Sequence, residues 1–121
     1  MTQGATVIEN QEVKGNGLVE SQTYKILVSD LLRDISSGVG YEQVVKEVQD
    51  LITCMSNCLR SFGSSSDAYQ IARQEITSLI KEVETSIWVR IRKNPEHEEK
   101  LFTECLPYFP NLKFRLELSK I

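Results

Sequence analysis

The sequence predicts a mainly α-helical fold: an antiparallel bundle of three main helices and a short fourth, with one β-strand at the C-terminus. Two long stretches, residues 41–62 and 67–93, carry apolar residues three and four positions apart, the spacing of one buried helical stripe. Gly63–Ser66 separates these stretches, and so short a break predicts an antiparallel helical hairpin. Residues 111–119 instead alternate strictly between apolar and polar, which is typical of a half-buried strand.

The length and composition favour one domain. A chain of 121 residues can enclose one core, and its 40% apolar and 26% charged residues are typical of a folded protein. Residues 1–17 are polar and contain three glycines, so we expect a flexible N-terminal arm there. Residues 18–121 then form a single helical domain with the C-terminal strand.

The first helix is expected to begin between Leu18 and Ser21 and to end at Gly38. Gly38 and Gly40 can both adopt a positive φ at low cost, which suits a helix stop followed by a tight turn. The apolar face of this helix consists of Tyr24, Leu27, Val28, Leu31, Leu32 and Ile35.

Capping signals define the later helices. The second helix should end at Phe62, with Gly63 as its C′ residue. Ser64–Asp67 reads S-x-x-D, a capping-box-like start for the third helix. Asn94–Pro95 ends that helix and starts the fourth, because Asn is a good N-cap and Pro is favourable at the first helical position.

The predicted C-terminal strand needs a partner, since a single strand is not stable alone. Its apolar face would consist of Leu112, Phe114, Leu116 and Leu118. The partner could be Thr6–Ile8, the same strand of a second subunit, or a strand of another protein. The unpaired strand and the long hairpin together favour a homodimer, in which two hairpins related by a twofold axis form a four-helix core.

Charge and hydropathy exclude several protein classes. The net charge of −3 gives no overall attraction to nucleic acid or to an anionic membrane. The longest apolar runs span three residues, so we expect no membrane-spanning segment, and the N-terminus does not resemble a signal peptide. The three cysteines are odd in number, which favours a reducing, cytoplasmic location.

Four residues could in principle form a zinc site: Cys54 and Cys58 on the second helix, with His97 and Cys105 near the fourth. The C-x3-C spacing on a helix differs from the usual C-x2-C knuckle, and cysteine is commonly just a buried residue. We therefore expect no metal and no other cofactor. No glycine-rich phosphate loop is present, and the only histidine lies in a glutamate-rich segment, so we expect no enzymatic activity.

The most distinctive local segment is the end of the third helix, where Trp88, Arg90, Arg92 and Lys93 gather. Such a cluster could contact nucleic acid or an acidic partner. Cations also complement the dipole of a helix C-terminus, and a tryptophan can simply pack in the core.

These observations favour a non-enzymatic protein–protein interaction module, such as an adaptor, an assembly subunit or an inhibitor, that acts through its helical faces and an edge strand. The alternative is a dimeric, helical RNA-binding protein that uses the basic cluster.

Overall fold

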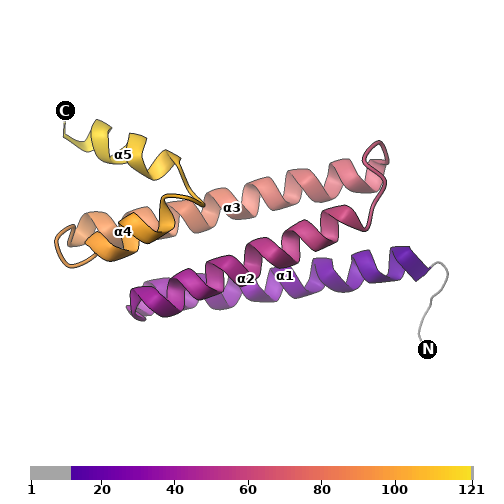
Figure 1. The fold of residues 1–121 in the computed structure, drawn as a ribbon, viewed down its shortest axis with the longest axis horizontal. Coiled ribbons are helices and arrows are strands. Elements are labelled where there is room, and N and C mark those ends of the chain that lie inside the picture. Colours follow the sequence, from indigo (N-terminus) through magenta and orange to yellow (C-terminus); the bar gives the residue numbers. More distant parts are fainter. Residues whose placement is uncertain (1–11, 121) are drawn as a thin grey trace.

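The computed structural model describes residues 12–120, and in that range the chain is helical with short connections (Figure 1). The helices are α1 (Glu12–Ser37), α2 (Tyr41–Arg60), α3 (Asp67–Lys93), α4 (Glu99–Cys105) and α5 (Asn111–Ser119). The prediction of a mainly helical, packed bundle is confirmed.

The three long helices lie side by side along the length of the molecule (Figure 1). α1 and α3 run in the same direction, and α2 runs back between their ends. The predicted α2–α3 hairpin is present, but α2 packs most extensively against α1. α4 packs on α2 and α3, and α5 contacts α3 at the same end of the molecule.

Helix ends agree with the sequence signals at two places. Gly38 has a φ of 84°, and the N–H groups of Gly38 and Val39 donate to the carbonyls of Ile35 and Asp34, which is a Schellman end to α1. α3 spans Asp67–Lys93 as predicted, although its N-cap is Ser66, whose Oγ accepts from the Tyr69 N–H at 3.1 Å.

Other ends differ from the prediction. α1 begins at Glu12, earlier than the expected start at Leu18–Ser21, so residues 12–17 of the predicted arm are helical. Residues 1–11, including Thr6–Ile8, lie outside the described residues. α2 ends at Arg60, and α4 begins at Glu99 after a turn in which the Glu98 N–H donates to the Asn94 carbonyl.

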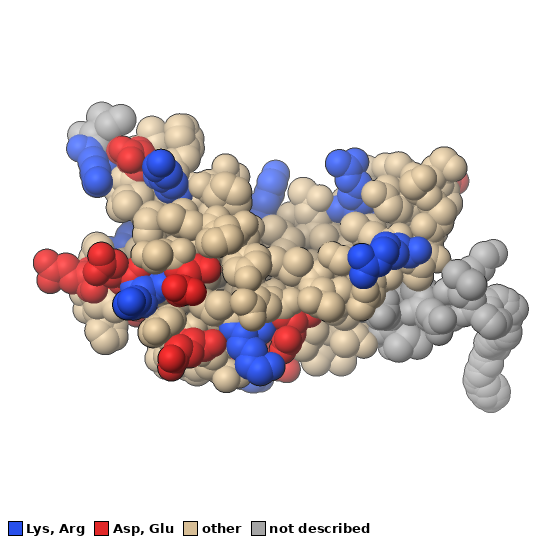
Figure 2. Space-filling view, in the orientation of Figure 1, with Lys and Arg blue, Asp and Glu red and all other residues tan. Residues whose placement is uncertain are grey.

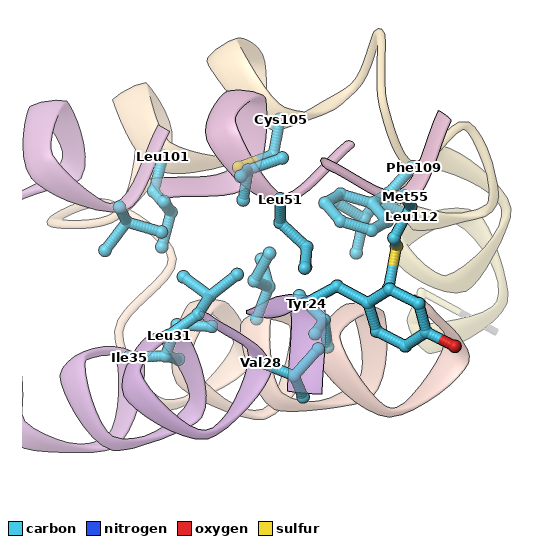
Figure 3. Packing of buried hydrophobic residues seen from close by; sticks show 14 of the residues in the cluster. Tyr24, Val28, Leu31, Ile35, Leu51, Met55, Leu101, Cys105, Phe109 and Leu112 are labelled. Atoms are coloured by element: carbon cyan, nitrogen blue, oxygen red, sulfur yellow. The ribbon is translucent and has the colours of Figure 1, made fainter. Parts of the chain in front are cut away.

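One hydrophobic core joins all five helices (Figure 3). Its largest fully buried side chains include Tyr24 of α1, Leu51 of α2 and Ile87 of α3. Phe109, in the α4–α5 connection, and Leu112 of α5 complete the core beside Tyr24 and Met55 (Figure 3).

The predicted C-terminal strand is wrong, because residues 111–119 form α5 and no strand occurs within residues 12–120. Alternation every second residue also places apolar side chains four apart, which is a helical spacing. The segment contains no β-branched or glycine residue and is rich in Leu, Lys, Arg and Glu, which favour helices. With no neighbouring strand in the described range, the helix satisfies the backbone groups locally.

Within residues 12–120, no helix combines the length and the apolar character needed to cross a membrane.

Three carboxylates meet where α1 packs on α2. Glu47 of α2 lies beside Asp34 and Asp30 of α1, and its Oε1 is buried without a hydrogen-bond donor among the described residues. Burial, followed by the two neighbouring carboxylates, raises the pKa of Glu47, while a hydrogen bond of 2.7 Å from Gln43 opposes this shift. The ionised form of Glu47 therefore destabilises the α1–α2 contact.

The helical form of α5 predicts opposite outcomes for two leucines. Leu112→Ala should lower the free energy of unfolding by about 2–4 kcal/mol, because Leu112 is fully buried. Leu118→Ala should change it by less than about 0.5 kcal/mol, because Leu118 is exposed. Urea unfolding followed by circular dichroism measures both. Equal losses would contradict the helix, since a strand places both leucines on one face.

The raised pKa of Glu47 predicts that Glu47→Gln stabilises the protein at pH 7. The folded state binds this proton more tightly than the unfolded state, so the wild type regains stability as the pH falls toward the ordinary value of 4.5. The gain at pH 7 should therefore shrink on acidification. Urea titrations between these pH values test this. The exposed Glu42→Gln is the control, and an equal gain there would contradict the assignment.

Candidate interaction surface

α5 is fixed to the bundle along one side. Leu112 is fully buried and Leu116 is half-buried. Arg115 extends to α3, where its Nη2 lies 3.1 Å from Thr85 Oγ1 and 3.5 Å from Glu84 Oε1. Glu84 is itself buried, so Arg115 supplies the cation that a carboxylate at this depth needs. These contacts set the rotation of α5 about its own axis.

The opposite side of α5 is apolar and exposed. Phe114 is 62% exposed and Leu118 is 51% exposed, and the two stand one helical turn apart. The predicted strand would have placed Leu112, Phe114, Leu116 and Leu118 on one face for pairing. On the helix these four divide, with the first and third turned inward and the other two outward. Sequence reasoning therefore missed this surface, although the four-residue spacing was present.

The basic cluster predicted at the end of α3 does not form one surface. Trp88 is half-buried and packs against the core. The Nε of Arg90 donates to Glu98 Oε2 at 2.9 Å, and both side chains are nearly buried, at 11% and 12% exposed. Only Arg92 and Lys93 are exposed.

Arg90 also contacts the C-terminal end of α1. Its Nη1 lies 3.4 Å from the Ile35 carbonyl oxygen, and α1 has no basic residue in its own last turn. A cation at a helix C-terminus is stabilising, because it faces the negative end of the helix dipole. Arg90 thus joins α1, α3 and the α3–α4 connection, which is a structural role.

A hollow of about 270 Å³ lies beside this ion pair, lined in part by Ser36, Val89, Lys93 and His97. The charges of Arg90 and Glu98 balance one another there. The C-terminal ends of both α1 and α3 also face the hollow, and their carbonyl groups oppose the binding of an anion. Lys93 adds a cation to the lining, and it lies against these carbonyl ends.

The zinc candidates are dispersed over the molecule. His97 is exposed at the hollow, Cys105 is buried in the core, and on α2 Cys54 is half-buried and Cys58 buried. No group of three or more histidine, cysteine or carboxylate side chains in the described range is arranged to hold a metal ion. Burial, with a smaller contribution from Glu104, raises the pKa of Cys105 to about 12, so its thiol stays protonated.

Comparison with known proteins finds no match among family models, curated proteins or solved structures. The role of the surface on α5 therefore has to be inferred from its own chemistry.

The two arginines of the basic cluster should respond differently to substitution. Arg90→Met should lower the free energy of unfolding by about 2–4 kcal/mol, because it leaves Glu98 nearly buried without its cation. Arg92 is exposed and lies two residues further along α3, so Arg92→Met should change the free energy of unfolding by less than about 0.5 kcal/mol. Urea unfolding measures both values. If the two variants lose stability equally, Arg90 does not hold the junction.

Proposed function

We propose that this chain is a non-enzymatic protein–protein interaction module whose contact surface is the outward face of α5. The observation that carries this proposal is the exposed pair Phe114 and Leu118 on a helix whose other side is fixed to the core. Exposed apolar side chains gathered in one place mark contact sites more often than single ones do. Two such side chains suit the centre of a small, reversible interface rather than an obligate subunit contact.

Two of the three other large apolar residues that are exposed in the described range support this choice by contrast. Ile71 on α3 is 67% exposed, but no other large apolar side chain is exposed within one turn of it. Ile26 on α1 is 61% exposed and has polar residues on either side along its face of the helix. Single exposed residues of this kind are normal on a protein surface.

Nucleic-acid binding has less support than it had from the sequence. A phosphate-binding patch needs several unpaired cations on one surface. Arg90 is already bonded to Glu98 and to α1, and Trp88 packs against the core, which leaves only two of the four predicted residues exposed.

Affinity capture with a matched control tests the proposal. The full chain, the double variant Phe114→Ser/Leu118→Ser and the control Ile71→Ser are immobilised and exposed to extract of the cells that make the protein. Quantitative mass spectrometry should find at least one protein that the wild type and control retain and that the double variant loses by at least about tenfold, equivalent to about 1.4 kcal/mol. Identical proteins on all three would disprove the proposal.

A further inference from the structure

We draw no further inference here: the strongest candidate, the exposed apolar pair Phe114 and Leu118 on α5, the helix at the upper left in Figure 2, carries nothing beyond the proposed function, because nothing among residues 12–120 shows what covers it.

Discussion

The apolar stripe of α2 is the constraint on which the rest of the structure depends. Val44, Val48 and Leu51 are completely buried. α2 contacts α1 most extensively and also packs against α3 and α4, so three helices share in covering its apolar side. Each fully buried aliphatic side chain contributes about 1.5–3 kcal/mol, so an uncovered stripe would leave the bundle unstable. Phe109 and Leu112 pack in the same core, and their burial holds α5 against the bundle.

The sequence predicted those parts of the fold that depend on local pattern and missed those that depend on distant contacts. The three long helices follow from spacing, and the limits of α3 follow from a serine cap and from Asn94–Pro95. α5 could not be assigned by period alone, because alternation over nine residues fits a strand and also a helix of four-residue spacing. Its residue types, with no β-branched side chain, were the better guide.

The candidate site was harder to predict, since burial and pairing decide which residues are available. Arg90 and Arg92 look equivalent in the sequence, two positions apart at the end of one helix. In the fold Arg90 faces Glu98 and the end of α1, some 55 residues earlier in the chain, whereas Arg92 faces outward. Likewise, the alternating pattern predicts Phe114 and Leu118 on the same face as Leu112, whereas in α5 they face away from the core. Neither division follows from residue type.

The anchoring of α5 divides this helix into a side that stabilises the fold and a side that is exposed. Leu112 and Arg115 fix one side of the helix to the core and to α3, and a helix holds all its side chains at set angles about its axis. Fixing the inner side therefore also fixes the direction in which Phe114 and Leu118 point, and pre-ordering of this kind lowers the entropy cost of any contact they make. Because Phe114 and Leu118 are exposed, they can be replaced without disturbing the core that Leu112 completes.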